Sequence, residues 1–348
     1  MKQRREIIFL SMIVTCLFSL TLRTFDIEAK EKPRLVILDT DIGNDVDDVL
    51  AMDMLYKYMD VGKIKLLAVM GDKDSPYTSE CIDIMNTWYG YPRIPIGTVS
   101  AGVKLPEYKN YAKYLCELES VSGRPLFRRS ISDYTDLQPA HILYRKILAE
   151  QPDSSVNVIS IGFFTNLSRL LETEADEYSP LSGRELVARK VHLLSVMGGD
   201  FVDNPIKEYN VVKDISSAQY VFDNWPGTVI VSPFRLGQQI RFPGEVMAKK
   251  TRWGVPSPVI EAYCHYRPMP YNRQTWDLTS ALFILEPDGG FFNISHAGKV
   301  NVDDSGVTTF SKNSSGKHYL LSVDETQVEM VKACFVRIFE SKPKHICF

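Results

Sequence analysis

Short apolar runs alternate with segments of helical spacing along most of the chain. Residues 34–39 form an apolar run of the kind found in a strand that is buried on both faces, and residues 46–59 then repeat apolar side chains at helical intervals. The same alternation predicts further strands at 64–70, 94–96, 156–161, 191–197 and 228–232, and further helices at 77–90, 138–149, 165–171 and 215–223. Strands that alternate with helices predict right-handed crossovers and therefore a mostly parallel sheet.

Three parts of the chain depart from this alternation. Residues 233–275 are rich in Pro, Arg and aromatic side chains. Residues 98–135 carry many Tyr, Lys and Arg with little apolar period, so we expect a flap over a site. Residues 298–311 and 318–323 alternate like hairpin strands, before a final helix at 325–340. We expect one α/β domain over residues 30–348, with an open, mostly parallel central sheet, helices on both faces and a small C-terminal β addition. In such sheets ligands bind beyond the carboxyl ends of the strands.

The N-terminus has its own pattern. Lys2, Arg4 and Arg5 precede an apolar stretch at residues 7–22, which is the arrangement of a secretory signal. We expect residues 1–29 to be a signal peptide and the mature domain to be exported, to the periplasm or outside the cell. An uncleaved signal would instead leave a membrane anchor. The rest of the sequence has no apolar stretch of about 18 residues, so we expect no membrane span in the mature domain.

Composition narrows the class of protein. The 348 residues include 40 Lys and Arg against 43 Asp and Glu, a net charge of -3, which argues against a protein that binds nucleic acid by neutralising phosphates. A hydrophobic content of 45% excludes a disordered chain. Five cysteines follow the predicted signal, an odd number without metal-ligand spacing, so buried free thiols are more probable than a disulfide framework.

Five aspartates lie within ten residues directly after the first predicted strand, in the run Asp-Thr-Asp-Ile-Gly-Asn-Asp-Val-Asp-Asp at 39–48. Like charges about 4 Å apart repel by several kcal/mol at an effective dielectric constant near 20, and a hard divalent cation with oxygen ligands offsets that repulsion. Gly43 permits a tight turn, while Asp47 and Asp48 would start the next helix, where the helix dipole favours anions. We therefore expect a cation site here rather than a solvated helix cap.

Two other interpretations of this turn are weaker. An alternating D-x-D-x-G-x-D also occurs in calcium-binding loops, but no Glu stands at loop position 12 and no helix precedes the turn. A strand followed by D-x-D resembles the haloacid-dehalogenase phosphatases and would make Asp39 or Asp41 a nucleophile. Residues 42–44, however, are Ile-Gly-Asn, where that family has Gly-Thr.

The turn resembles the D-x-D-P-G-x-D-D signature of the nucleoside hydrolases of the inosine–uridine-preferring superfamily. Ile42 stands where Pro is usual, and two extra residues precede Asp47, which leaves the role of Asp45 open. Further family motifs follow in order over most of the mature chain: Gly71-Asp72, Ile161-Gly162 with Thr165-Asn166, Met197-Gly198-Gly199, Asn204, Glu208-Tyr209-Asn210 and Trp276-Asp277. On these motifs the chain is identified as a member of the family.

The resemblance implies calcium-dependent hydrolysis of the N-glycosidic bond of ribonucleosides, a small-molecule substrate, to ribose and free base. Because the sugar passes through an oxocarbenium-like state, the site needs an anionic environment and an activated water. The resemblance implies that Ca²⁺ binds Asp41, Asp48, Asp277 and the backbone carbonyl of Ile161. Asp41 would also act as the base for the water, and Asp39 would orient the turn. The implied substrate-binding residues are Asp47, Met197, Asn204, Glu208, Tyr209 and Asn210.

Trp276 departs from part of the family, in which a His before the last metal-binding Asp protonates the leaving base. The purine-preferring subgroup instead stacks the base between aromatic rings and uses an Asp after the second strand. Trp276 and Asp72 resemble that arrangement and are candidate catalytic residues, and Tyr108 in the expected flap is a candidate second ring. An indole face attracts a protonated purine, so we expect purine nucleosides to be preferred.

Two other classes of function stay open. A ribose- or nucleoside-binding protein with the same fold and metal, but without turnover, is consistent with the missing His. A phosphatase that uses the acidic turn would release phosphate from nucleotides and depend on Mg²⁺. Release of ribose from nucleosides separates these classes. Family members commonly form homodimers or homotetramers, and we expect a homo-oligomer here.

Overall fold

The computed structural model describes residues 32–107, 110–248 and 252–348, so the expected signal peptide at 1–29 and the candidate ring of Tyr108 lie outside the described residues. Residues Pro33–Phe348 form one compact unit. Within the described ranges, no helix is long and apolar enough to cross a membrane. Cys81, Cys116 and Cys334 are buried free thiols, which confirms the expectation for these three side chains.

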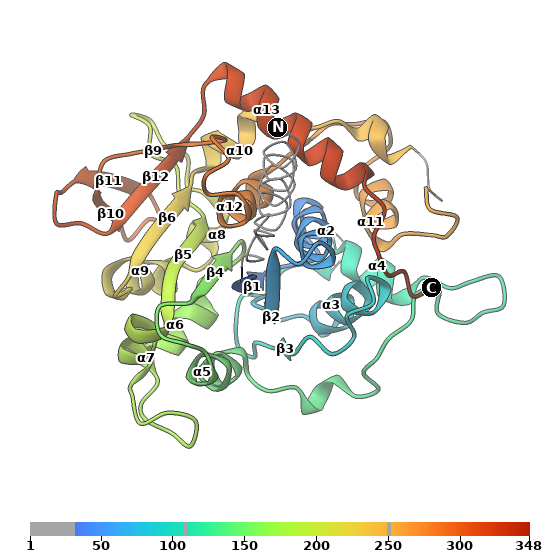
Figure 1. The fold of residues 1–348 in the computed structure, drawn as a ribbon, viewed down its shortest axis with the longest axis horizontal. Coiled ribbons are helices and arrows are strands. Elements are labelled where there is room, and N and C mark those ends of the chain that lie inside the picture. The colour runs from blue at the N-terminus through green and yellow to red at the C-terminus, as the bar shows by residue number, and fades with distance from the viewer. Residues whose placement is uncertain (1–31, 108–109, 249–251) are drawn as a thin grey trace, which may run out of the picture. The chain divides into compact units, whose positions relative to one another are not determined.

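In the described part of the chain, a sheet of ten strands runs through the molecule (Figure 1). Its parallel part has the order β3-β2-β1-β4-β5-β6. The strands are β1 (Arg34–Thr40), β2 (Ile64–Gly71), β3 (Ile96–Gly97), β4 (Val156–Ser160), β5 (Val191–Met197) and β6 (Thr228–Ser232). The chain therefore starts in the middle of the sheet and winds outward in both directions, which is the doubly wound arrangement. The predicted fold class, an open and mostly parallel sheet, is confirmed.

The C-terminal strands extend this sheet. β12 (His318–Ser322) pairs in parallel with β6, and β10 (Gly298–Val302) pairs antiparallel with both β12 and β11 (Thr308–Lys312). β9 (Asn293–Ile294) pairs with β12. The predicted β addition is thus a continuation of the main sheet rather than a separate layer.

Helices cover both faces of the sheet. The face that carries the acidic turn is covered by α2 (Asp47–Asp60), α3 (Pro76–Trp88), α4 (Tyr111–Glu117), α11 (Pro258–Tyr266), α12 (Trp276–Leu285) and α13 (Glu325–Glu340). The opposite face is covered by α5 (Ala140–Glu150), α6 (Thr165–Glu172), α7 (Gly183–Lys190) and α9 (Ile215–Asn224). Alternate residues of β1 enter opposite cores, Val36 and Leu38 on one side and Ile37 on the other, as the two-residue period of a strand requires.

The segments without a regular apolar period hold short elements. Residues 98–135, the expected flap, contain α4, and a 3-10 turn follows at Tyr134–Asp136. Between β5 and α12 the chain also forms α8 (Tyr209–Lys213), α10 (Phe234–Gln239), a 3-10 turn at Gly244–Met247, and a small sheet of β7 (Arg241–Phe242) and β8 (Arg273–Gln274). Of these pieces, α10 follows the carboxyl end of β6, and β8 leads directly into α12.

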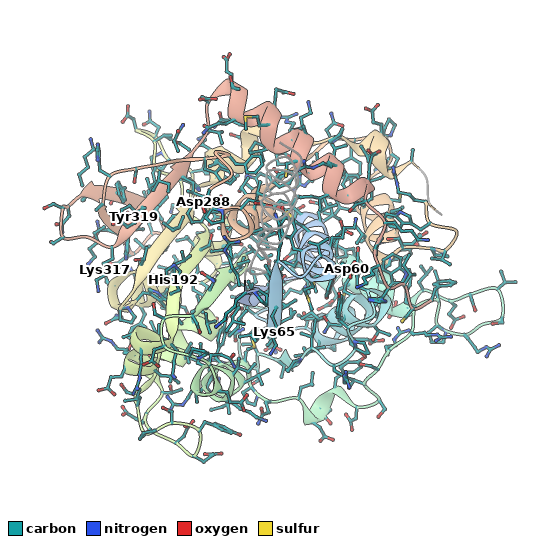
Figure 2. The ribbon with its side chains drawn as sticks, in the orientation of Figure 1. Asp60, Lys65, His192, Asp288, Lys317 and Tyr319 are labelled. Atoms are coloured by element: carbon teal, nitrogen blue, oxygen red, sulfur yellow. The ribbon has the colours of Figure 1, made fainter. Side chains whose placement is uncertain are left out.

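The two ends of the parallel strands differ in chemistry. At the amino ends, Lys65 on β2 and His192 on β5 are exposed (Figure 2). At the carboxyl ends, β1 runs into the buried carboxyl groups of Asp39 and Asp41, and its neighbour β4 runs into Ile161. Because the chain leaves β1 and β4 toward opposite faces of the sheet, a crevice forms between their ends, which is where open α/β sheets bind ligands.

Candidate active site

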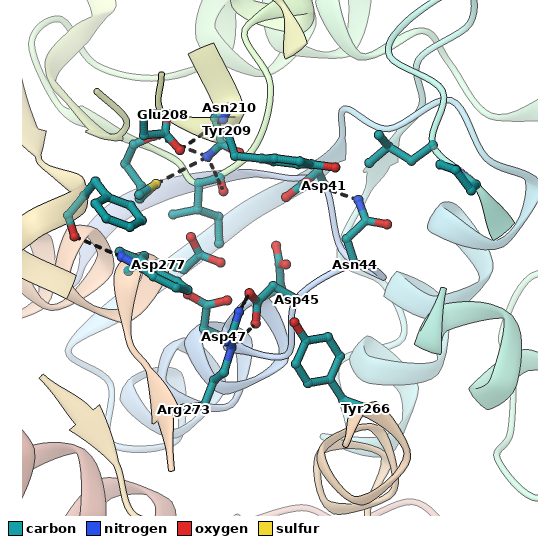
Figure 3. A pocket seen from close by; sticks show the side chains of 17 residues that line it. Asp41, Asn44, Asp45, Asp47, Glu208, Tyr209, Asn210, Tyr266, Arg273 and Asp277 are labelled. Carbon is teal, nitrogen blue, oxygen red and sulfur yellow. Dashed lines mark hydrogen bonds and ion pairs between the residues drawn. The ribbon is translucent and has the colours of Figure 1, made fainter. Parts of the chain in front are cut away.

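A cavity of about 360 Å³ lies at the carboxyl ends of β1, β4 and β5 (Figure 3). Segments far apart in the sequence contribute to its wall. The lining residues are Asp41, Asn44, Asp45, Asp47, Asp48, Leu105, Pro106, Ile161, Met197, Glu208, Tyr209, Asn210, Phe234, Tyr266, Arg273, Trp276 and Asp277. Leu105 and Pro106 belong to the expected flap, and this part of it does border the cavity.

The first turns of two helices bring three carboxyl groups together. Asp47 and Asp48 open α2, Asp277 lies in the first turn of α12, and these two helices pack against each other. One carboxyl oxygen from each of the three residues lies within 4.8 Å of the others. The backbone N–H of Asp277 donates to Asp47 Oδ2 at 3.1 Å, and the hydroxyl of Thr40 donates to Asp48 Oδ1. Two helix N-termini therefore point their partial positive charges at one acidic cluster.

This cluster has too little positive charge around it to be stable as three carboxylates. Burial, and then repulsion from neighbouring aspartates, raises the pKa of Asp47, Asp48 and Asp277 well above the usual range. Buried, closely spaced carboxyl oxygens are the ligand set that a hard cation such as Ca²⁺ prefers. The residues present therefore fit a divalent cation, which would restore the charged form of all three side chains.

Asp41 and Ile161, which carry the two further expected ligands, line the same cavity. The side-chain amide of Asn44 donates to Asp41 Oδ2 at 3.4 Å. Burial raises the pKa of Asp41 to about 6, although the charge of Lys73 opposes the shift. All four residues expected to supply ligands thus border one cavity, although only Asp48 and Asp277 of the four belong to the closely converging carboxyl groups. The structure also adds Asp47, which we had expected on the ribose, to the converging carboxyl groups.

The motif Glu208-Tyr209-Asn210 also reaches the cavity, because it forms the start of α8. Glu208 is the N-cap of this helix and accepts backbone N–H groups from Asn210 at 3.0 Å and Val211 at 3.2 Å. The side-chain amide of Asn210 donates to the carbonyl oxygens of Ile161 at 3.3 Å and Met197 at 3.4 Å, which ties α8 to the ends of β4 and β5. Four expected substrate-binding residues, Met197, Glu208, Tyr209 and Asn210, therefore lie in the wall.

Two expected site residues are not part of the lining. Asn204 is exposed on the loop before α8. Asp72 is fully buried beside Asp39 and Gly162, where burial and then the charge of Asp39 raise its pKa well above the usual range. Asp39 itself accepts hydrogen bonds from Tyr144 at 2.9 Å and from Asn166 at 3.0 Å. These contacts join Asp39 to α5 and α6. Its expected role in orienting the turn, and a direct contact of Asp72 with a base, stay predictions.

The apolar part of the wall is built around Trp276. Its ring lies 5.4 Å from that of Phe234, nearly parallel at 20°, and its Nε1–H donates to the Phe234 carbonyl at 2.9 Å. The guanidinium carbon of Arg273 lies 4.9 Å from the centroid of the Trp276 ring and 5.2 Å from that of Tyr266. Trp276 lines the cavity as expected, but its ring already has two partners.

No sequence signal marks Phe234, Tyr266 and Arg273, because they lie in the segment 233–275, which has no regular apolar period. The sequence left the role of Asp45 open, and the structure gives this residue a partner. Asp45 accepts a two-pronged ion pair from Arg273, with Nε 2.7 Å from Oδ1. The side chains of Asp45 and Arg273 meet beside Asp47 in Figure 3. A carboxylate followed much later by an arginine is too common a pattern to predict such a pair.

Comparisons with known proteins agree with this geometry. The family model described as "Inosine-uridine preferring nucleoside hydrolase" matches residues 36–334. Among solved structures, a plant nucleoside hydrolase, the PpNRh1 enzyme, is similar with a TM-score of 0.68 at 17% identity, over 89% of this chain and 100% of that chain. The inosine-uridine preferring nucleoside hydrolase from Bacillus anthracis has a TM-score of 0.63 at 15% identity, over 88% and 99% of the two chains.

A third solved structure, the purine-preferring ribonucleoside hydrolase from Gardnerella vaginalis, has a TM-score of 0.63 at 15% identity. It is matched over 88% of this chain and 98% of that chain. At such identities the likeness concerns the fold. A comparison with curated protein sequences finds no match.

Proposed function

Since the chain belongs to the inosine-uridine preferring nucleoside hydrolase family, we propose that it hydrolyses the N-glycosidic bond of ribonucleosides to ribose and free base, with bound Ca²⁺ and a preference for purine nucleosides. Family and fold support nucleoside hydrolysis in general. The observation that carries the proposal is the meeting of Asp41, Asp48, Asp277 and the Ile161 carbonyl with the Glu208 motif in one cavity.

The polar part of the cavity suits ribose. Glu208 and Asn210 are buried and fixed by their own backbone and side-chain hydrogen bonds, so they can hold sugar hydroxyls without losing much conformational freedom. Carboxylates around the sugar stabilise the positive charge that develops as the bond to the base breaks. A bound Ca²⁺, held by Asp41, Asp48, Asp277 and the Ile161 carbonyl with Asp47 beside them, would supply positive charge that orients the attacking water and the hydroxyls.

Asp41 is the residue that we propose as general base. Its carboxyl group lines the cavity with those of the other proposed cation ligands, Asp48 and Asp277, so its carboxylate can take a proton from a water held there. Water then adds to C1′ of the ribose while its proton passes to Asp41. The electron pair of the broken C1′–N bond stays on the base.

The preference for purines rests on the apolar part of the wall. Leu105, Pro106, Phe234, Tyr266 and Trp276 contribute apolar and aromatic side chains to the wall, which suit a planar base. A purine has two fused rings and covers more of that surface than a pyrimidine, so its binding removes more apolar area from water.

The decisive experiment measures free ribose. The purified chain from residue 30 is incubated with inosine, guanosine, adenosine, uridine and cytidine, with Ca²⁺ or with a chelator. We expect ribose from the purine nucleosides, less from the pyrimidine nucleosides, and none with the chelator. Tight nucleoside binding without ribose would contradict the proposal and establish a binding protein, and equal rates with inosine and uridine would contradict the purine preference.

We also propose that the protein is exported and forms a homodimer or homotetramer. The basic residues before the apolar stretch at 7–22 support export. N-terminal sequencing of the protein from its native cells tests for cleavage near residue 29. Light scattering of the purified mature chain tests the oligomer.

A further inference from the structure

Breaking an N-glycosidic bond leaves an electron pair on a ring nitrogen of the base, and something must stabilise that charge. A protonated His, Lys or Cys is absent from the described residues that line the cavity. Burial raises the pKa of the two lining tyrosines, to about 12 for Tyr209 and above its usual value for Tyr266, and so makes both poor acids. The carboxyl groups gather where the ribose and cation are proposed to bind.

Arg273 provides the one positive charge in the lining, as far as the described residues show it. Its guanidinium lies between the rings of Trp276 and Tyr266, at 4.9 and 5.2 Å from their centroids, and so belongs to the apolar part of the wall that suits a base. Such contacts between a guanidinium and aromatic faces are attractive and hold its plane. The guanidinium of Arg273 therefore lies in the half of the cavity from which the base would leave.

The hydrogen bonds of Arg273 leave part of its donor capacity unused. Nε and one terminal nitrogen donate to the two oxygens of Asp45, and the other terminal nitrogen donates to Gln274 Oε1 at 3.2 Å. A guanidinium has five N–H groups, so two remain for a ligand. Burial opposes the charge of Arg273, but the ion pair with Asp45 keeps its pKa above even its usual high range. Arg273 therefore stays positively charged: it can donate a hydrogen bond to the base but does not transfer a proton to it.

We propose that Arg273 is a further catalytic residue of the hydrolysis proposed above: its guanidinium donates a hydrogen bond to the departing base and stabilises the electron pair that the base takes from the C1′–N bond. The base leaves as an anion and takes a proton from solvent. That proton balances the one that the attacking water gives to Asp41. This inference rests on the proposed function. It assigns to Arg273 the stabilisation of the leaving base that a general acid would otherwise provide.

Asp45 has a positioning role in this scheme. It belongs to the stretch where the acidic turn is two residues longer than the family pattern, and its carboxyl group lies outside the converging group of Asp47, Asp48 and Asp277. Instead the carboxyl group of Asp45 forms an ion pair with Arg273. The extra residues of the turn thus explain how an arginine more than two hundred residues away is held in place.

The test compares two leaving groups. Inosine releases a poor leaving group that needs stabilisation, whereas 4-nitrophenyl β-D-riboside releases a phenolate that is stable by itself. Removing a fixed donor at developing charge typically costs about 10²–10³ in kcat. We expect Arg273→Gln to lower kcat for inosine by about that factor and kcat for the nitrophenyl riboside by less than about tenfold. Arg273→Lys keeps the positive charge but loses the planar guanidinium with its paired N–H donors. Its kcat for inosine should lie between those of wild type and Arg273→Gln.

Two further measurements test the proposed role of Arg273. Asp45→Asn should lower kcat for inosine more than for the nitrophenyl riboside, because it releases Arg273 without removing it. Equal losses on both substrates in Arg273→Lys, in a protein whose thermal unfolding midpoint is that of wild type, would overturn the proposal and leave Arg273 a structural residue. If wild type cleaves neither substrate, it is the proposed function that fails.

Discussion

The backbone N–H of Asp277 donates to the carboxylate of Asp47 at 3.1 Å and joins the first turn of α12 to the first turn of α2 across 230 residues of sequence. This bond brings Asp277 up to the acidic turn and lets the two helix N-termini share one cluster of carboxyl groups. The same geometry that suits a cation is unfavourable without one, because the three groups repel each other in a buried place. Activity and stability should therefore respond in opposite directions when one carboxylate is removed.

Asp48→Asn and Asp277→Asn should each abolish ribose release, by about 10³-fold or more, since the loss of a charged ligand costs several kcal/mol of transition-state stabilisation. In the presence of a chelator the same variants should unfold no more easily than wild type. A gain of about 1 kcal/mol is expected because repulsion inside the cluster falls. Ribose assays and denaturant unfolding measure the two effects. Asp288→Asn, an exposed aspartate outside the site, is the matched control and should change neither.

Calcium should stabilise the wild-type fold. A ligand that binds only the folded state at a concentration of about 100 times its Kd adds about 2.7 kcal/mol to the free energy of unfolding. We expect the thermal midpoint to rise with added Ca²⁺ and to fall with a chelator. In Asp48→Asn this shift should disappear. A shift of the same size in that variant would place the cation elsewhere.

Gly162→Ala should destabilise the protein and disturb the site. A Cβ at this position would lie 2.5 Å from the backbone nitrogen of Asp41 and 2.5 Å from Asp72 Oδ2, and both of these residues are buried. Overpacking of this kind costs about 1–3 kcal/mol. Gly227→Ala is the control, because its Cβ would meet only Trp225 at an ordinary distance of 3.6 Å. Equal unfolding free energies in the two variants would contradict the close approach at Gly162.

His318 should make the stability of the fold depend on pH. Burial lowers its pKa from 6.5 to about 4, and its Nδ1 accepts the backbone N–H of Val300 at 2.9 Å. Between these two values the unfolded chain binds the proton that the folded chain does not, so stability falls as pH falls from about 6.5 toward 4. The loss reaches about 3 kcal/mol at pH 4, at about 1.4 kcal/mol per pH unit.

The measurement is the difference between wild type and His318→Asn, which keeps an acceptor for Val300 and does not titrate. Unfolding free energies of the two proteins at pH 7, 5.5 and 4.5 should diverge progressively as pH falls. Parallel curves would show that His318 is not the group responsible. Other titrating groups contribute equally to both proteins and cancel.

How far the sequence predicts the site depends on where each residue lies. Asp41, Ile161 and Met197 follow or end strands of a parallel sheet, and the carboxyl ends of such strands share one edge, so their meeting is predictable. Asp72 also follows a strand, but the position after a strand does not tell which way the side chain points. In the structure it turns into the protein beside Asp39.

The other residues of the site and the pairing of the C-terminal strands could not be predicted, because they depend on tertiary contacts alone. Arg273 and Tyr266 lie where no apolar period marks an inner face, and the sequence does not show that the Arg273 guanidinium packs over the rings of Tyr266 and Trp276. The C-terminal strands were predicted by their alternation, but the pattern within a strand does not name its neighbour. That β12 pairs with β6 and extends the main sheet is therefore visible only in the structure.

The central place of β1 also affects how the chain assembles. Of the strands that the structure describes, β1 is the first to be synthesised, yet its two neighbours are β2 and β4, and Leu35 pairs with Val156. One edge of this apolar strand can be closed soon after synthesis, but the other stays open until more than a hundred further residues have followed. Unpaired apolar edges invite association between chains. The strand that leads into the acidic turn thus keeps one edge unpaired while more than a hundred residues are made, and the newly made chain is exposed to aggregation in that interval.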